Sequence, residues 1–260
     1  MSDVELVLRE QRGELTLLTL NRPERRNAMS LDLVIALRDA LRDCMNDSQC
    51  RGIIVCGAGD HFCSGGDISG MTEERSIAES RRRMGIFHEL ARVIVAGAKP
   101  VIAAVDGYAA GAGFSLALAA DYLVASDNAK FVCSFSRVGL QPDLGLLWTI
   151  RQRVGLGQAK RIIASARKVQ VGEALELGLV DEVVAPEKLL DRAAEVCGEF
   201  TAGAPLPLAV MKQAYAWGID TFEDALRNEM DNSPGLYLTR DHRAAVTAFL
   251  EKRTPEFRGE

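Results

Sequence analysis

Two short apolar runs, each ending in glycine, most restrict how this 260-residue chain can fold. They are GIIVCGAG at residues 52–59 and VIAAVDG at residues 101–107. A strand that is apolar at every position is usually covered on both faces, as in parallel sheets flanked by helices. Glycine-rich turns and then helical spacing follow both runs, so the order strand, turn, helix repeats. The pattern predicts an α/β core.

The rest of the chain predicts a hairpin before this core and helices after it. Residues 4–20 alternate about Arg12-Gly13, which predicts a β-hairpin with one face buried. Ser30 is expected to cap a helix beginning near Leu31. A second helix is expected within residues 76–100, and two further short strands within residues 121–135. The predicted core-facing side chains of the second helix are Met84, Phe87, His88, Ala91, Ile94 and Val95.

From Gly139 onward the pattern is almost entirely helical. We therefore expect an α/β core over residues 1–195 and a helical region over residues 196–260. A helical tail joined without a flexible linker commonly packs onto its own core or onto a neighbouring subunit.

Composition and charge exclude several classes of function. Apolar residues make up 48% of the chain and charged residues 26%, and the formal net charge is −5, which fits a globular protein and not a nucleic-acid-binding surface. The six cysteines form no CxxC pair and lie near no histidine cluster, so we expect reduced, mostly buried thiols and no metal site. No secretory signal or membrane span is recognised, and a cytoplasmic location is expected.

Two glycine-rich turns could carry chemistry. HFCSGGDISG at residues 61–70 lacks the ending of a P-loop, and GYAAGAGFSL at residues 107–116 lacks the full dinucleotide-binding pattern. Both expose backbone N–H groups, and two such groups that converge on one point would form an oxyanion hole. The alternative is that the glycines only permit tight turns and close packing. No Ser-His-Asp pattern is present, so a stabilised anion would be an enolate and not an acyl-enzyme intermediate.

Asp143 is the candidate acid. It follows Pro142 directly and stands among apolar residues in SRVGLQPDLGLLW. A carboxylate in such surroundings must be paired, be solvated by a pocket, or shift toward its protonated form. The alternative is that Asp143 is a turn residue or the N-cap of the following helix.

Five segments, in this order, resemble the signature segments of the enoyl-CoA hydratase/isomerase (crotonase) superfamily over essentially the whole chain. They are LNRPERRNAM, FCSGGDI, AVDGYAAGAGFSLALAAD, FVCSFSRVGLQPDLG and ALELGLVDEVV. The resemblance implies a core of repeated ββα units and a helical C-terminal trimerisation region. It also implies trimers or dimers of trimers, and acyl-CoA thioesters as substrates. Coenzyme A is part of the substrate, and no other cofactor is implied.

The resemblance also implies roles for individual residues. The N–H groups of Gly66 and Ala112 would bind the thioester oxygen. Residues implied in coenzyme A binding are Arg25, Arg26, Ala28, Ser64, Asp67, Ile68 and, from a neighbouring subunit, Lys252. Residues implied in the acyl pocket are His88, Phe114, Ser115 and Phe135, of which Phe114 and Phe135 would exclude water.

The acids depart from the hydratase pattern. Ser115 and Phe135 occupy the positions where enoyl-CoA hydratases carry two glutamates, and neither can act as a base. Asp143 falls where relatives that move double bonds, such as the ring-opening isomerase of phenylacetate breakdown, carry a single acid. We therefore expect Asp143 to move a proton from C2 to C4 of a 3-enoyl-CoA.

Other functions remain open. The chain could be a hydratase of another kind. It could also be a 4-halobenzoyl-CoA dehalogenase, in which Asp143 would be the nucleophile and His88 would assist. A non-catalytic acyl-CoA-binding homologue is the third alternative.

Overall fold

A six-stranded sheet forms the centre of the computed structural model, which describes residues 5–70 and 74–260. The strand order is β1-β2-β3-β4-β6-β9; only β1 and β2 pair antiparallel, and the other neighbours are parallel. The bounds are β1 (Val7–Arg12), β2 (Leu15–Leu20), β3 (Gly52–Gly57), β4 (Val101–Val105), β6 (Tyr122–Ser126) and β9 (Glu182–Val184). A second sheet has the order β5-β7-β8, with β5 (Tyr108–Ala110), β7 (Lys130–Val132) and β8 (Lys168–Gln170).

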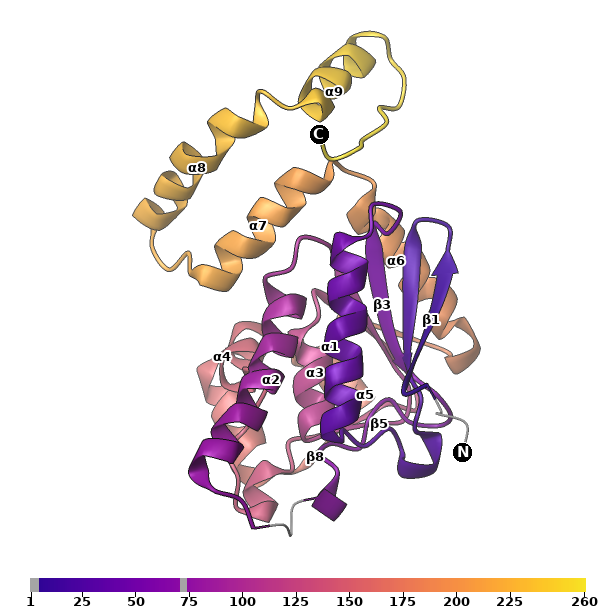
Figure 1. Ribbon diagram of the computed structural model, residues 1–260, viewed down its shortest axis with the longest axis vertical. Coiled ribbons are helices and arrows are strands. Elements are labelled where there is room, and N and C mark those ends of the chain that lie inside the picture. The colour runs from indigo at the N-terminus through magenta and orange to yellow at the C-terminus, as the bar shows by residue number, and fades with distance from the viewer. Residues whose placement is uncertain (1–4, 71–73) are drawn as a thin grey trace.

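Helices cover both faces of the main sheet (Figure 1). On one face lie α1 (Leu31–Asn46), α2 (Ile77–Val95) and α3 (Ala112–Ala119), and on the other lies α6 (Leu189–Thr201). Alternate residues of β3 point to opposite faces: Ile53 and Val55 join the cluster under α1 to α3, whereas Ile54 and Cys56 join the side chains of α6. The strand is apolar throughout because both of its faces are buried, as predicted.

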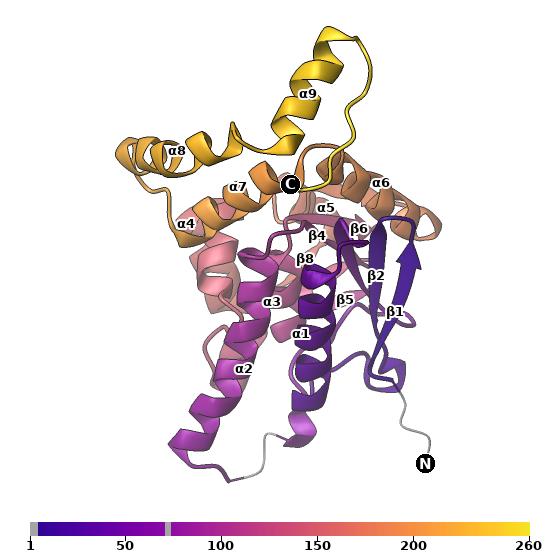
Figure 2. The same ribbon diagram turned by 45° about the horizontal axis from the view of Figure 1, so that its top comes forward.

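The remaining helices connect these layers or follow them. The elements that connect the strands and helices of these layers along the chain are η1 (Pro23–Arg25), η2 (Ile68–Gly70), η3 (Phe135–Val138), α4 (Leu146–Ser165), α5 (Val171–Glu176) and η4 (Pro186–Lys188). The chain ends in α7 (Pro205–Trp217), α8 (Phe222–Leu236) and α9 (Arg240–Leu250). Figures 1 and 2 both show α8 and α9 standing apart from the core.

The first helix and the hairpin follow the prediction in most respects. Ser30 Oγ accepts a hydrogen bond from the Leu33 amide at 3.2 Å, which confirms the expected cap of α1. The hairpin about Gly13 is confirmed within the described residues, which exclude Val4. Its burial differs from the prediction: β1 is mostly exposed and β2 is buried on both faces. The reason is that β1 is an edge strand, whereas β2 lies between β1 and β3.

The expected core face of α2 is wrong at two positions. Leu90 and Ile94 are buried, but Met84 and His88 are exposed. The side of α2 that packs on the core carries Ile86, Leu90 and Ile94, and His88 lies on the opposite side. Met84 belongs to the N-terminal half of α2, which extends beyond the strands in Figure 2.

The region after Gly139 is less purely helical than predicted. Strands β8 and β9 interrupt it, each with only three residues, too few to show an alternating pattern. The expected division after residue 195 falls inside α6, which packs on the main sheet through Ala193, Val196 and Cys197. The helices that stand apart from the core begin with α7.

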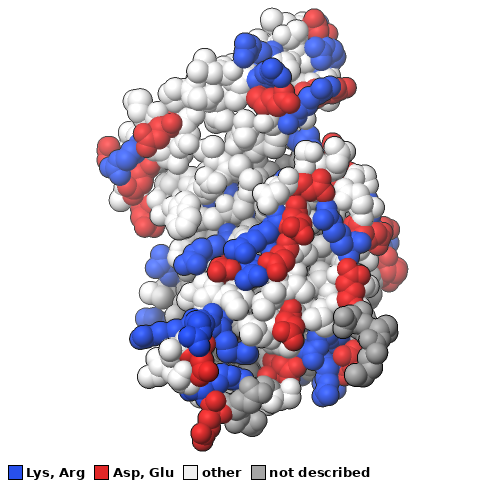
Figure 3. Space-filling model, viewed as in Figure 1, with Lys and Arg blue, Asp and Glu red and all other residues white. Residues whose placement is uncertain are grey.

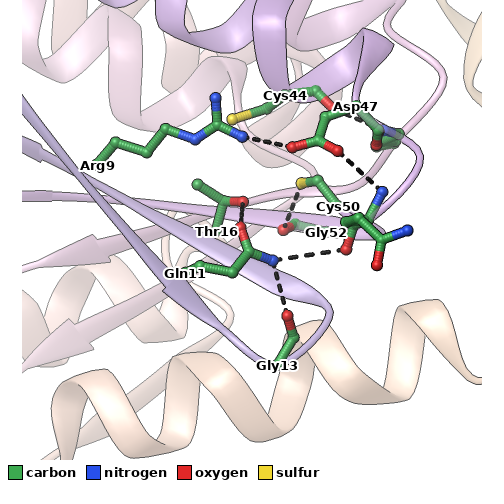
Figure 4. Close-up of polar contacts among 10 residues, drawn as sticks. Arg9, Gln11, Gly13, Thr16, Cys44, Asp47, Cys50 and Gly52 are labelled. Atoms are coloured by element: carbon green, nitrogen blue, oxygen red, sulfur yellow. Dashed lines mark hydrogen bonds and ion pairs between the residues drawn. The ribbon is translucent and has the colours of Figure 1, made fainter.

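All six cysteines are free and buried, as expected. Figure 4 shows Cys44, at the end of α1, and Cys50, before β3, among the polar contacts that attach the hairpin to the α1–β3 turn. Arg9 Nη2 lies 2.6 Å from Asp47 Oδ2, and Cys50 Sγ donates to Gly52 O at 3.4 Å. Among the described residues, no helix has the length and apolar character needed to cross a bilayer.

Candidate active site

The two glycine-rich turns lie directly against each other. The Cys63 amide donates to Tyr108 O and the Ala110 amide donates to Cys63 O, both at 2.9 Å. A Cβ atom at Gly65, whose φ is +105°, would lie 2.8 Å from Ala110 O, and one at Gly113 would lie 2.6 Å from Cys63 Cβ. Glycine is therefore required at 65 and 113 for close packing. At these two positions, packing explains the glycines. The close approach of the two turns also brings Gly66 and Ala112 near each other.

The amides of Gly66 and Ala112 are free to bind a ligand. Within the described part of the chain, neither N–H donates to a protein acceptor. Beside Gly66, by contrast, the Ser64 amide donates to Arg26 O at 3.0 Å and the Asp67 amide to Met29 O at 3.1 Å. Ala112 is the first residue of α3, where N–H groups lack an intrahelical acceptor and the helix dipole favours negative charge.

Asp143 is a half-buried residue whose carboxylate lacks a hydrogen-bond partner on one oxygen. Its Oδ1 is buried and, among the described residues, accepts no hydrogen bond. Burial raises the pKa of Asp143 to about 6, and the neighbouring Ser115 hydroxyl only partly offsets the shift. The N-cap of α4 is Gly145, and no side chain caps that helix. The helix-cap alternative for Asp143 is therefore wrong.

Two further observations place Asp143 beside the glycine turns. Ser115, whose hydroxyl acts on Asp143, lies one turn after Ala112 on α3 and is fully buried. Burial raises the pKa of the Cys63 thiol to about 12, and the charge of Asp143 adds to that shift. The carboxylate thus lies near both the first turn of α3 and the segment that leads to Gly66.

A strained turn holds Asp143 in place. Leu144 has φ of 49° and Gly145 has φ of 77°, and the Leu146 amide donates to Asp143 O at 2.9 Å. A left-handed leucine costs roughly 1–2 kcal/mol. Leu144 and Leu146 are both buried, which offsets that cost. Strain of this kind tends to persist at functional sites.

Of the other predicted pocket residues, two are buried and one is exposed. Phe135 is buried in η3, the segment that precedes Asp143. Phe114 is buried in the main core, where its ring centroid lies 6.0 Å from that of Phe131. His88 is exposed on α2, so a role as a buried partner of Asp143 has no support.

The predicted coenzyme A residues come together only in part. Ser64 lies against the exposed Arg25 and Arg26, because its hydroxyl donates to Arg25 O at 3.4 Å and its amide to Arg26 O. Asp67 instead forms an ion pair with Arg22 at 3.0 Å and accepts two hydrogen bonds from Ser69, which hold its pKa low. Its carboxylate therefore stabilises the loop.

Three predicted positions differ in exposure and place. Ala28 is half-buried, and its carbonyl accepts from Arg22 Nη1 at 2.6 Å. Ile68 is 69% exposed. Lys252 is exposed and follows α9, a helix that lies at the opposite end of the molecule from β5 in Figure 1, and its role in a neighbouring subunit stays a prediction.

Sequence reasoning missed Asn27, which shapes this loop. Its buried amide accepts from the Arg22 amide at 2.9 Å and donates to Ala58 O at 3.0 Å and His61 O at 2.7 Å. Arg26 and Asn27 both have positive φ, of 50° and 55°. An asparagine in a polar turn was the available signal, since it tolerates this conformation and bonds to nearby backbone.

Comparisons with known proteins agree on one family. The model of the enoyl-CoA hydratase/isomerase family matches residues 10–260. A short-chain-enoyl-CoA hydratase of Clostridium acetobutylicum is 35% identical, with 96% of each chain covered. A 1,2-epoxyphenylacetyl-CoA isomerase of Escherichia coli is 33% identical, again with 96% of each chain covered. The crystal structure of an enoyl-CoA hydratase from Polaromonas sp. JS666 is similar with a TM-score of 0.90 at 33% identity, covering 96% of this chain and 99% of that one. This chain therefore belongs to the enoyl-CoA hydratase/isomerase family and has its α/β fold.

Proposed function

We propose that this protein is an acyl-CoA isomerase that moves a double bond from the 3,4 to the 2,3 position of a thioester, without a cofactor. The observation that carries the proposal is the Asp143 carboxylate, whose buried Oδ1 has no partner and whose pKa is raised to about 6, beside two free backbone amides. A base whose pKa lies near the working pH is suited to proton transfer. The similarity to an isomerase of acyl-CoA thioesters supports the same conclusion.

The mechanism assigns one task to each part of the site. The Gly66 and Ala112 amides bind the thioester oxygen, so negative charge that develops when C2 loses its proton is stabilised. Asp143 takes that proton and returns it at C4, while the electron pair moves from the enolate to shift the double bond. One carboxylate serves both steps when C2 and C4 lie on the same face of a bent acyl chain.

Hydration of a 2-enoyl-CoA is the second candidate, because relatives at 35% and 34% identity are named as hydratases. A hydratase must hold and activate a water molecule, yet the two positions that carry glutamates in the family's hydratases are Ser115 and Phe135 here. An ultraviolet assay separates the candidates. We expect absorbance of the conjugated thioester to rise with 3-enoyl-CoA and to stay constant with crotonyl-CoA. Consumption of crotonyl-CoA without isomerisation of 3-enoyl-CoA would contradict the proposal.

Replacing Gly66 with proline tests the oxygen-binding amides. Proline has no N–H, and loss of one such donor costs about 3 kcal/mol of transition-state stabilisation, or roughly two orders of magnitude in kcat. Gly66→Ala is the matched control, because it keeps the donor and should retain most activity. Wild-type turnover by a correctly folded Gly66→Pro protein would mean that the thioester binds elsewhere.

The protein is also expected to assemble as a trimer or a dimer of trimers. The last three helices expose large apolar side chains, among them Trp217 at 73%, Phe222 at 75% and Phe249 at 82%. Figure 3 shows an uncharged stretch of surface along α7 and α8, between charged groups over α9 and at the far end of α8. Light scattering should give the mass of three or six chains, and deleting the residues after Ala245 should weaken coenzyme A binding by removing Lys252. A monomer with unchanged affinity would contradict this expectation.

A further inference from the structure

Two lysines from the smaller sheet lie close to the ring of Tyr108. The Nζ atom of Lys130 is 5.6 Å from the ring centroid, and that of Lys168 is 5.4 Å from it. The sheet brings them together, because Tyr108 on β5 pairs with Lys130 on β7, and β7 pairs in turn with β8, which carries Lys168. A cation–π contact holds an ammonium group but does not neutralise it. Two positive charges therefore share one aromatic ring.

A third positive charge adds to this pair, and none of the three is balanced. Within the described residues, Lys130, Lys168 and Arg26 join no ion pair with an acidic side chain. Lys168, through a hydrogen bond, is the largest cause of a lowered pKa at Tyr108, and the charges of Lys130 and Arg26 contribute. Lysine and arginine grouped without acidic partners attract anions, and phosphate in particular.

This cluster lies beside the free amides. Arg26 is held against the turn that leads to Gly66, because its carbonyl accepts from the Ser64 amide at 3.0 Å. Tyr108 precedes Ala112 by four residues, so their Cα atoms are at most about 14 Å apart. The pantetheine arm of coenzyme A is long enough to connect a thioester at the amides to a phosphate at the lysines.

We propose that Lys130, Lys168 and Arg26 bind a phosphate group in the nucleotide half of the coenzyme A thioester. This inference rests on the proposed function, since it takes the thioester oxygen to be bound at Gly66 and Ala112. The lysines act as point charges and Arg26 supplies a fork of donors, while the ring of Tyr108 keeps both ammonium groups in position. The cluster contributes to binding of the substrate and takes no part in the proton transfer.

The test compares two substrates that differ only in the nucleotide. Wild-type protein and a Lys130→Met/Lys168→Met variant are assayed with a 3-enoyl-CoA and with the corresponding pantetheine thioester, which has no phosphate. For the CoA thioester, KM should rise roughly ten- to hundredfold with kcat little changed, since uniform binding is lost. For the pantetheine thioester, kcat/KM should change less than about threefold. Lys188→Met removes an exposed lysine elsewhere and should leave both substrates unaffected.

Charge and not side-chain shape should account for the loss. A Lys130→Arg/Lys168→Arg variant keeps both positive charges and should restore most of the affinity. Higher salt should raise the KM of the wild type for the CoA thioester more than that of the methionine variant, because salt screens exposed charges. An equal rise of KM for both substrates, or no rise for either, overturns the proposal.

A binding experiment separates this proposal from the proposed function. If neither thioester is isomerised, the proposed function fails, but calorimetry with coenzyme A itself still tests the cluster. Weaker binding of coenzyme A by the methionine variant supports the proposal, and equal binding overturns it. Titration with inorganic phosphate tests whether the lysines bind a free anion instead of coenzyme A. Lysine-dependent binding of phosphate, together with unchanged binding of coenzyme A, would also overturn the proposal.

Discussion

Replacing Asp143 with asparagine should lower the isomerisation of a 3-enoyl-CoA by roughly two to four orders of magnitude while binding of the thioester changes little. Asparagine keeps the shape of the side chain but cannot accept a proton. In D2O, the wild type should place deuterium at C2 or C4, as long as the carboxyl group exchanges its proton between the two steps. Single-turnover assays measure the rate of isomerisation, and mass spectrometry of the product measures its deuterium content.

The pH dependence follows from the raised pKa of Asp143. Proton removal requires the ionised carboxylate, so kcat/KM should rise with pH up to about 6 and level off above it. Stability should change in the opposite direction. A carboxyl group whose pKa is raised on folding contributes stability below its unfolded pKa, and that contribution is lost as pH rises through the folded value. Asp143→Asn should therefore become more stable than the wild type above pH 6, by at most about 3 kcal/mol.

Three outcomes would contradict this assignment. Full isomerase activity in a correctly folded Asp143→Asn protein would exclude the proton shuttle. Halide release from a 4-halobenzoyl-CoA, with a covalent aryl-enzyme intermediate in the mass spectrum, would make Asp143 a nucleophile. A substitution without effect on activity, or on the pH dependence of urea unfolding, would leave Asp143 as a structural residue. Ser115→Ala is the control, because it removes a neighbouring buried hydroxyl and keeps the Asp143 carboxylate.

Replacing Lys212 with methionine should destabilise the protein by roughly 3–5 kcal/mol. Lys212 is 4% exposed on α7, forms an ion pair with Asp121, and donates to Ile94 O at 3.1 Å and Lys99 O at 2.7 Å. Burial raises the pKa of Asp121 and lowers that of Lys212, so desolvation disfavours both charges and the ion pair opposes it. Without the lysine, the half-buried carboxylate of Asp121 loses its counter-ion. Urea unfolding at one fixed protein concentration measures the loss, because assembly makes stability depend on concentration.

The double variant Lys212→Met/Asp121→Asn is the matched control. It removes both charges, so it should be more stable than Lys212→Met alone, although Asp121 also accepts from the Val101 amide at 2.8 Å. Lys160→Met, at an exposed site on α4, should change stability by less than about 0.5 kcal/mol. A Lys212→Met protein within 1 kcal/mol of the wild type would mean that water reaches Asp121 when the lysine is absent.

Elements buried on both sides were the easiest to predict. The runs that became β3 and β4 are apolar at every residue, because each is covered by α6 on one face and by α1 to α3 on the other. The strands β8 and β9 were missed because each has only three residues and adjoins sequence with a helical pattern, whereas the equally short β7 continues into the apolar residues 131–133. His88 was assigned to the core because the apolar residues of α2 fit more than one side of the helix, and the buried side is the one that carries Ile86, Leu90 and Ile94.

The candidate site was predicted in its residues more than in its geometry. Asp143 and the two glycine turns stand out in the sequence, since a carboxylate among leucines and repeated glycines need an explanation. The left-handed conformation of Leu144 could not be predicted, because leucine disfavours it and only the burial of its side chain stabilises it. Asp67 was predicted to bind coenzyme A but pairs with Arg22 instead. This ion pair could not be predicted, because the two residues are 45 positions apart in the chain.

The backbone pairing of Cys63 with β5 has a consequence for how such a site can change. The positions of the Gly66 and Ala112 amides are set by main-chain hydrogen bonds, whereas the side chains at 115, 135 and 143 are attached to α3, η3 and the turn before α4. Substitution of these side chains leaves the pairing of the main chain untouched. The same two amides can then act together with a base at any of these three positions. Moving the carboxylate from position 143 to position 115 or 135 would change the reaction and leave the backbone as it is.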